Sequence, residues 1–408
     1  MTDPLVTFDR ELTARLPQLG ITRLADTTGL DRLGIPTHSC VRPGTSDSVW
    51  VYSGKGFTPE ASRVSAIMEC IERTSALWSA ASVRIARRGE LAGRWPVLGP
   101  ERFTEASAPA DDRPEAWVLA HRVRGGRAWV PAALVFLGRP ADAAINWRLV
   151  AQTSNGLGAG PTRDQALAHA LEELIERDTV SCSELRASHA GSAALAAIAR
   201  AAGLDIAAAL TGFRDDVDLA ITIDPATLPA RAVELVRRFE AIGVRVVVKY
   251  LPGDLGVPVF GAAAIEELGF DNVLAAAGFA ASYDPAQAVC RALLEVAQSR
   301  ATDRQGARED CGHAEKDRHA APPAAHWLAT PGRAVAFGAL PWAARIGDRV
   351  CHYTRALTAV GLDDVLYHAF HAPAGIHVVR ALVPGIETWH STAGESRLGP
   401  RMQRALAT

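Results

Sequence analysis

Three segments of the chain place an acidic stripe beside an apolar stripe at helical spacing. The first, residues 64–73, contains neither Pro nor Gly and predicts a helix. Its apolar stripe consists of Val64, Met68 and Ile71. Its polar stripe, within about 60° at 100° per residue, consists of Ser65, Glu69 and Glu72. Such a stripe lies at the margin of the interior, where a carboxylate is costly unless a cation or partner charge offsets it.

Two later segments repeat this arrangement. Residues 171–178 contain Glu173, Glu176 and Arg177, and residues 291–300 contain Arg291, Glu295 and Gln298. One ExxE pair alone is usually a solvated helix face, and an arginine beside it can simply pair with a glutamate. Three such helices, each with acids and an arginine, predict a shared site instead. Acids hold Mg2+ and arginines bind phosphate oxygens, which is the combination that a nucleoside triphosphate requires.

The rest of the chain predicts a mixture of helices and strands, of α/β or mixed α+β class. Helices are expected within residues 1–20, from Thr58-Pro59, from Thr162 to about 183 with Gln165 in a capping box, at 193–210 and 229–242, from Pro285, and at 340–360. Strands are expected at 48–53, 128–137, 149–154, 217–223, 244–250, 257–265, 364–370 and 376–383. Residues 20–36 and 153–162 are Gly-rich and predict loops.

We interpret residues 1–408 as a single domain. Its predicted parts are an N-terminal segment and loop (1–55), a core (56–310) with an α/β lobe at about 188–265, a mobile loop (311–335) and a C-terminal part (336–408). The loop contains three histidines without the spacing of metal ligands.

Composition excludes several functional classes. The net charge of −2 gives no general attraction to nucleic acid or an anionic membrane. No stretch of 18 uninterrupted apolar residues and no signal pattern occurs, so we expect a cytoplasmic protein that does not bind membranes. The six cysteines form no CxxC pair, which argues against a disulfide framework or a zinc ribbon.

Two glycine-rich segments precede the acidic helices. Gly54-Lys55-Gly56 predicts a turn before a helix, a position that can hold a phosphate, but it lacks the spacing of a Walker loop. The segment around Asn155 leads directly into the helix of Glu173 and Glu176. Glycine-rich turns usually serve tight geometry alone, but this position before an acidic helix favours a nucleotide role.

Taken together, these motifs resemble those of the YcaO family. The resemblance rests on the Gly-Lys-Gly turn, the Sx3ExxER helix (Ser65 to Arg73), the Ser-Asn-Gly loop with its ExxERD helix (Asn155 to Asp178), and the RxxxExxQxR helix (Arg291 to Arg300). These motifs occur in order over most of the chain.

The resemblance implies a fold of the family's own, with ATP and Mg2+ as cofactors and phosphorylation of a peptide backbone amide oxygen as the activity. It implies that Mg2+ is held by Glu69, Glu72, Glu173 and Glu176. It implies phosphate contacts from Arg177 and Arg291. It implies a nucleotide site completed by Lys55, Ser65, Asn155, Glu295 and Gln298.

The chain departs from the family pattern at two positions. Gln165 replaces a glutamate that many members carry, and Pro161 replaces a residue that is often Asn. We therefore expect one weaker metal contact. The Pro-rich terminus of many azoline-forming members is not expected, because the chain ends with residues 403–408, and neither is a fused leader-peptide-binding domain.

The nucleophile decides the product. A neighbouring Cys, Ser or Thr of the substrate gives an azoline, an amine gives an amidine, and an external sulfur donor gives a thioamide. The pattern of residues 20–36 resembles stand-alone members, including those that work with a TfuA-type partner. We therefore favour thioamide formation on a ribosomally made peptide or protein, with cyclodehydration as the alternative, and expect a homodimer.

Two other classes remain open. Four glutamates on paired ExxE helices also suit a di-metal carboxylate enzyme, but such bundles require a Glu-x-x-His motif on each of two helices, and this chain does not have two such motifs. The second class is a silent scaffold that binds ATP or peptide without turnover. The intact acidic set argues against it, while Gln165 leaves it possible. Phosphate release in the presence of substrate discriminates between an enzyme and a scaffold.

Overall fold

The computed structural model describes residues 3–91, 93–104, 114–139, 142, 145, 153–202, 220–269, 272–309, 327–340, 342, 347–388 and 399–402. The α-helices are α1 (Pro4–Ala14), α2 (Pro59–Ser75), α3 (Arg163–Ala202), α4 (Ala230–Glu240), α5 (Pro285–Gln305) and α7 (Arg349–Ala359). The 3-10 helices are η1 (Thr28–Leu30), η2 (Ala80–Ser82), η3 (Arg88–Leu91), η4 (Pro100–Arg102), η5 (Ala132–Leu134), η6 (Pro225–Thr227) and η7 (Phe337–Ala339).

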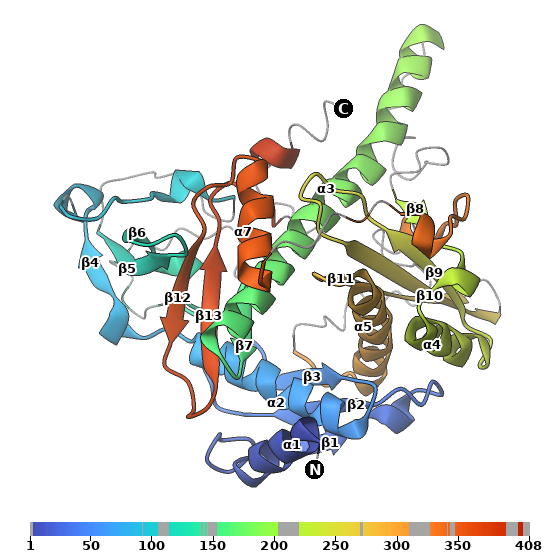
Figure 1. Cartoon of the computed structure of the whole chain (residues 1–408), viewed down its shortest axis with the longest axis horizontal. Helices are drawn as coiled ribbons and strands as arrows, with labels where there is room; N and C mark the ends of the chain where they lie inside the picture. The colour runs from blue at the N-terminus through green and yellow to red at the C-terminus, as the bar shows by residue number, and fades with distance from the viewer. Residues whose placement is uncertain are drawn as a thin grey trace.

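The strands are β1 (Arg23–Asp26), β2 (Thr37–Val41), β3 (Val51–Lys55), β4 (Arg84–Ala86), β5 (Glu115–Arg122), β6 (Arg127–Pro131), β7 (Leu157–Gly160), β8 (Ile221–Thr222), β9 (Arg245–Tyr250), β10 (Val259–Gly269), β11 (Asn272–Ala281), β12 (Leu366–Phe370) and β13 (His377–Leu382). They form three sheets with helices packed against them (Figure 1). This confirms the mixed α+β class. Pairings between these strands are antiparallel, and parallel pairing is seen at isolated bridges such as Leu77 with Leu137.

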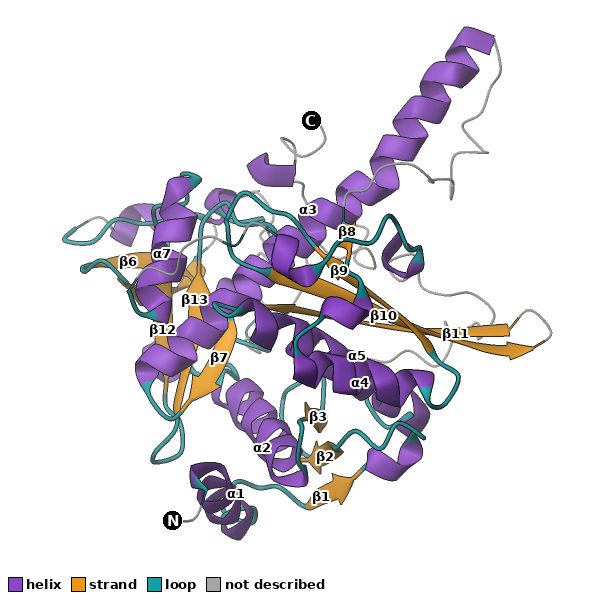
Figure 2. Ribbon diagram, turned by 45° about the vertical axis from the view of Figure 1, so that its right-hand side comes forward, coloured by secondary structure: helices purple, strands orange, loops and turns teal. Residues whose placement is uncertain are grey.

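The three sheets surround the three acidic helices. The sheet β1-β2-β3 carries α2, whose outer side packs on α1. The six-stranded sheet has the order β4-β5-β12-β13-β7, with β6 paired to β5, and α3 packs on β7 and β13. α3 continues beyond the sheets as a long projection (Figures 1 and 2).

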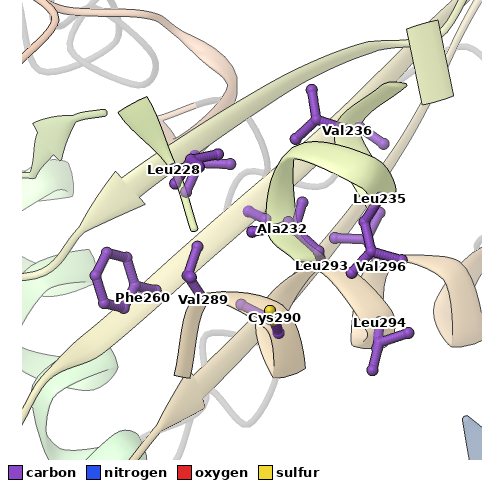
Figure 3. Packing of buried hydrophobic residues seen from close by; sticks show 14 of the residues in the cluster. Leu228, Ala232, Leu235, Val236, Phe260, Val289, Cys290, Leu293, Leu294 and Val296 are labelled. Atoms are coloured by element: carbon purple, nitrogen blue, oxygen red, sulfur yellow. The ribbon is translucent and has the colours of Figure 1, made fainter. Parts of the chain in front are cut away.

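The third sheet, β11-β10-β9-β8, is covered on one face by α4 and α5 (Figure 2). Side chains of both helices interdigitate over the sheet (Figure 3). Phe260 from β10, Phe239 from α4 and Leu293 from α5 are fully buried there. Burying a large apolar side chain contributes about 1.5–3 kcal/mol, so this core fixes α5 and its polar side chains relative to the sheet.

Each acidic helix packs on the strand before it through a glycine. A Cβ at Gly54 would lie 2.2 Å from the Ser62 carbonyl oxygen of α2. One at Gly158 would lie 2.3 Å from the Ala166 oxygen of α3, and one at Gly278 2.5 Å from the Ala292 oxygen of α5. Strand and helix backbones thus approach more closely than any side chain permits. Three similar strand–helix units result: β3–α2, β7–α3 and β11–α5.

Many predicted elements are confirmed, including α1, α2, α4, α5, β9, β10, β12 and β13. Local signals explain the helix starts, because Thr58 and Asp284 accept backbone N–H groups as N-caps and a proline follows each. Thr162 likewise accepts the Gln165 N–H before α3. Among the described residues, none of the helices is both long and apolar enough to cross a bilayer.

Several predicted loops are strands. β1 forms within residues 20–36 because it pairs with β2, and β7 forms within residues 153–162 because it pairs with β13. Gly54 and Lys55 belong to β3 rather than to a turn, since they pair with β2. Cross-strand pairing with distant residues leaves little local trace in a sequence. The two glycines of the Gly-Lys-Gly motif serve the packing of β3 on α2, because a Cβ at either position would meet the α2 backbone.

Other boundaries differ. The strand expected at 128–137 ends at Pro131, where the missing N–H interrupts the ladder, and η5 follows. α3 does not end near 183 but runs to Ala202 through an alanine-rich segment, which replaces the loop expected before the helix at 193–210. The helix expected at 340–360 begins only at Arg349. Residues 149–152, 203–219 and 310–326, which include most of the predicted mobile loop, lie outside the described residues.

Candidate functional site

A cavity of about 830 Å3 lies among α2, α3 and α5, at the ends of β3 and β7. Nearly all the predicted site residues line it, although they come from segments far apart in the sequence. They are Lys55, Ser65, Glu69, Glu72, Glu173, Glu176, Arg177, Arg291, Glu295 and Gln298. Asn155 is buried and does not line the cavity. The residue before it, Ser154, lines the cavity instead.

The wall formed by α2 and α3 is acidic. Burial raises the pKa of Glu72 well above its usual value, and the charges of Glu173 and Glu69 add to the rise. Burial likewise raises the pKa of Glu173 to about 7, against the opposing effect of Arg177. The pKa of Glu176 is also raised, chiefly by burial. Several carboxylates thus face one cavity where each disfavours ionisation of the others.

Such a donor set suits a hard cation. Mg2+ prefers carboxylate oxygens and would stabilise the ionised form, which burial and the neighbouring carboxylates disfavour here. Within the described part of the chain, no three acidic, histidine or cysteine side chains form a ready-made metal site. In nucleotide sites Mg2+ takes one or two carboxylates and completes its shell with phosphate oxygens and water.

Basic side chains face the same cavity. Arg177 lies 3.8 Å from Glu176 and 4.0 Å from Glu173, and its buried Nε has no hydrogen-bond partner among the described residues. The Lys55 ammonium lies 3.2 Å from the Glu295 carboxylate. A buried guanidinium N–H without a partner is costly, and an anion in the cavity would satisfy it. The donor set therefore also fits phosphate.

Sequence reasoning missed several residues of this site. His169 lines the cavity one helical turn before Glu173, and that spacing was a usable signal. The Ser53 backbone donates to Glu69 at 2.9 Å, and Arg308 approaches the same carboxylate at 3.5 Å. Arg308 follows α5 and joins α2 only through the tertiary fold, so no local pattern predicts it.

Three charged motif residues make ion pairs that hold the scaffold together. Arg73 binds Asp47 through two hydrogen bonds of 2.9 and 2.8 Å. Asp178 binds Arg401 through bonds of 2.7 and 2.8 Å. Arg300 binds both Asp31 and Glu266 at 2.7 Å. These buried pairs connect α2, α3 and α5 to neighbouring segments.

The two departures from the family pattern lie near the start of α3. Pro161 lines the cavity, whereas Gln165 is exposed and its Oε1 accepts a hydrogen bond from the Thr162 hydroxyl. Gln165 therefore serves the helix cap in this structure.

Comparison with known sequences places these motifs in context. The family model described as YcaO cyclodehydratase, ATP- and Mg2+-binding, matches residues 53–387. An uncharacterized protein of Methanothermobacter thermautotrophicus is 31% identical over 403 residues, which cover 96% of each chain. An uncharacterized protein encoded in the tfuA 3′ region of Rhizobium leguminosarum bv. trifolii is 28% identical, over 91% of this chain and 85% of its own length.

Solved structures share the fold. YcaO from Methanopyrus kandleri, bound with AMPPCP and Mg2+, superposes with a TM-score of 0.69 at 22% identity and covers 98% of this chain and 95% of its own. A heterocyclase in complex with substrate and cofactor superposes with a TM-score of 0.66 at 19% identity, over 93% of this chain and 52% of its own. The predicted cofactors, ATP and Mg2+, agree with the description of the matching family. The chain belongs to the YcaO cyclodehydratase family.

Proposed function

We propose that this protein uses Mg-ATP to phosphorylate a peptide backbone amide oxygen and then directs sulfur to the activated carbon, giving a thioamide. The observation that carries the proposal is one cavity lined by both acidic and basic side chains of α2, α3 and α5, together with Lys55 of β3. Its volume of about 830 Å3 lies in the range of small-molecule sites, about 300–1,000 Å3.

The residues divide into three roles. Glu69, Glu72, Glu173 and Glu176 would hold Mg2+, which shields phosphate charge. Lys55, Arg177 and Arg291 would bind phosphate oxygens. The nucleotide site would be completed by Ser65, Glu295 and Gln298, with the buried Asn155 supporting the wall next to Ser154.

The chemistry requires positioning more than side-chain catalysis. The amide oxygen attacks the γ-phosphorus and ADP leaves, so the carbon gains a phosphate leaving group. A hydrosulfide ion then adds to that carbon, the carbon–oxygen bond breaks as phosphate departs with the oxygen, and the S–H proton passes to the departing phosphate, which leaves a carbon–sulfur double bond. An arginine- and lysine-lined cavity that holds the triphosphate in line with the amide supplies most of what this transfer needs.

The relative encoded in a tfuA 3′ region supports a TfuA-type partner and thereby the thioamide product. We further propose that the chain acts in the cytoplasm as a homodimer of a single domain, on a ribosomally made peptide or protein. The second candidate is cyclodehydration with a nucleophile of the substrate, giving an azoline or an amidine. The cyclodehydratase description of the family and the similarity to a heterocyclase favour it.

Mass spectrometry separates the two. The protein is incubated with a pool of synthetic peptides, Mg-ATP and sodium sulfide, with and without a TfuA-type protein, and peptide masses and released phosphate are recorded. The proposal expects the mass gain of exchanging oxygen for sulfur, dependent on both ATP and sulfide. Loss of one water without sulfide would instead support cyclodehydration. If no peptide changes mass and no phosphate is released under any condition, the result would support a scaffold that does not turn over ATP.

A further inference from the structure

Glu172 lies next to Glu173 on α3 but does not belong to the cavity wall. Its side chain is 1% exposed, and its carboxylate accepts hydrogen bonds from charged and neutral side chains of two other helices. Arg291 Nη1 of α5 donates to one carboxylate oxygen at 2.8 Å. Arg349 and the Tyr353 hydroxyl, both of α7, donate to the other oxygen. A carboxylate of α3 thus joins α5 and α7 behind the cavity.

The arrangement leaves part of Arg291 available to a ligand. Both hydrogen bonds that Arg291 donates to described residues come from Nη1, one to Glu172 and one to the Ala281 carbonyl at 3.3 Å. Arg291 also lines the cavity, with 30% of its side chain exposed. Its Nε and Nη2 donors therefore remain for an anion, in an orientation that the two Nη1 bonds fix.

The hydrogen bonds around Glu172 also hold the start of α5. The Tyr353 hydroxyl donates its O–H to Glu172, and its oxygen also accepts the Tyr283 backbone N–H at 2.7 Å. Tyr283 directly precedes Asp284, the N-cap of α5. Glu172 therefore constrains both the Arg291 guanidinium and the end of the helix that carries it.

The charges support a positioning role. One buried carboxylate stands between two guanidinium groups, so removing its charge would leave Arg291 and Arg349 to repel each other. Three donors from α5 and α7 bind the two oxygens of Glu172, so the carboxylate holds both guanidinium groups in place.

We propose that Glu172 is a positioning residue that presets Arg291 to bind a phosphate group of the nucleotide. The inference rests on the proposed function, since it assigns phosphate to Arg291. Neither the motif pattern nor the lining of the cavity identifies Glu172. Its role follows from its partners alone.

The test is calorimetric titration of Mg2+ with AMPPCP into the wild type and into Glu172→Gln. The amide keeps the size of the side chain but loses its charge, so we expect the Kd to rise about tenfold. Glu266→Gln is the matched control, because Glu266 is also a buried carboxylate that binds arginines but lies outside the cavity wall. It should lower the melting temperature and leave the Kd unchanged.

A double-mutant cycle with Arg291→Gln shows whether Glu172 acts through Arg291. The double variant should bind no more weakly than Arg291→Gln alone. Should Glu172→Gln not fold, Tyr353→Phe removes one donor of the same carboxylate and should raise the Kd more modestly. Wild-type affinity in these Glu172 and Tyr353 variants, or additive effects in the cycle, would overturn the inference. A wild type that binds no nucleotide would overturn the proposed function as well, which keeps the two failures apart.

Discussion

At the residue scale, the site is defined by carboxylates whose ionisation is unfavourable without a cation. Glu72, Glu173 and Glu176 come from two helices and face one cavity, and burial raises the pKa of each. Glu172, one position away, is also buried, but a hydrogen bond with His169 and the charges of Arg291 and Arg349 lower its pKa. Adjacent glutamates thus have opposite electrostatic environments, one suited to a metal ion and the other to holding an arginine.

The raised pKa of Glu173 predicts a pH-dependent cost to stability. Its folded-state pKa of about 7 exceeds its usual value of 4.5, so the folded chain binds more protons between these pH values and stability falls as the pH rises through them. In the absence of Mg2+, we expect Glu173→Gln to melt above the wild type at pH 8 and close to it at pH 5. Melting curves across this range test the expectation. A difference that does not depend on pH would show that Glu173 does not titrate there.

At the element scale, three strand–helix units bring the polar stripes together. In each unit a strand glycine lets the following helix approach, and the helix then presents its acidic side to the common cavity. The spacing of the first two units is the same, with Gly54 before Glu69 and Gly158 before Glu173 by 15 residues in both cases. Glycine packing therefore sets where the carboxylates lie.

This account predicts that Gly158→Ala disturbs the site as well as the fold. The new Cβ would lie 2.3 Å from the Ala166 oxygen and 2.7 Å from the Ala170 nitrogen, both in the backbone of α3. We expect a loss of about 1–3 kcal/mol in the free energy of unfolding, measured with urea, together with weaker nucleotide binding. Gly338→Ala is the control, because nothing lies within 4 Å of its Cβ position. Equal stability of the two variants would argue against close packing of β7 on α3.

At the scale of the whole molecule, the sequence predicts the site better than the sheets. Helix starts such as Thr58-Pro59 and Asp284-Pro285 are local signals, and stripes at helical spacing identify which faces meet. β1 and β7 were expected to be loops because their pairing partners lie elsewhere in the chain. For the same reason the sequence does not predict the contacts of Arg308 and Glu172, whose partners come from distant segments and meet them only in the folded protein.

The central claim is that the cavity among α2, α3 and α5 binds Mg2+ and a nucleoside triphosphate. Titration of AMPPCP with Mg2+ into the wild type and into Glu176→Gln tests it most directly, because it needs neither the peptide nor the sulfur source. We expect one site per chain in the wild type and an affinity at least about tenfold lower in the variant, with both proteins folded. Equal affinity of the two proteins, or no binding by the wild type, would contradict it.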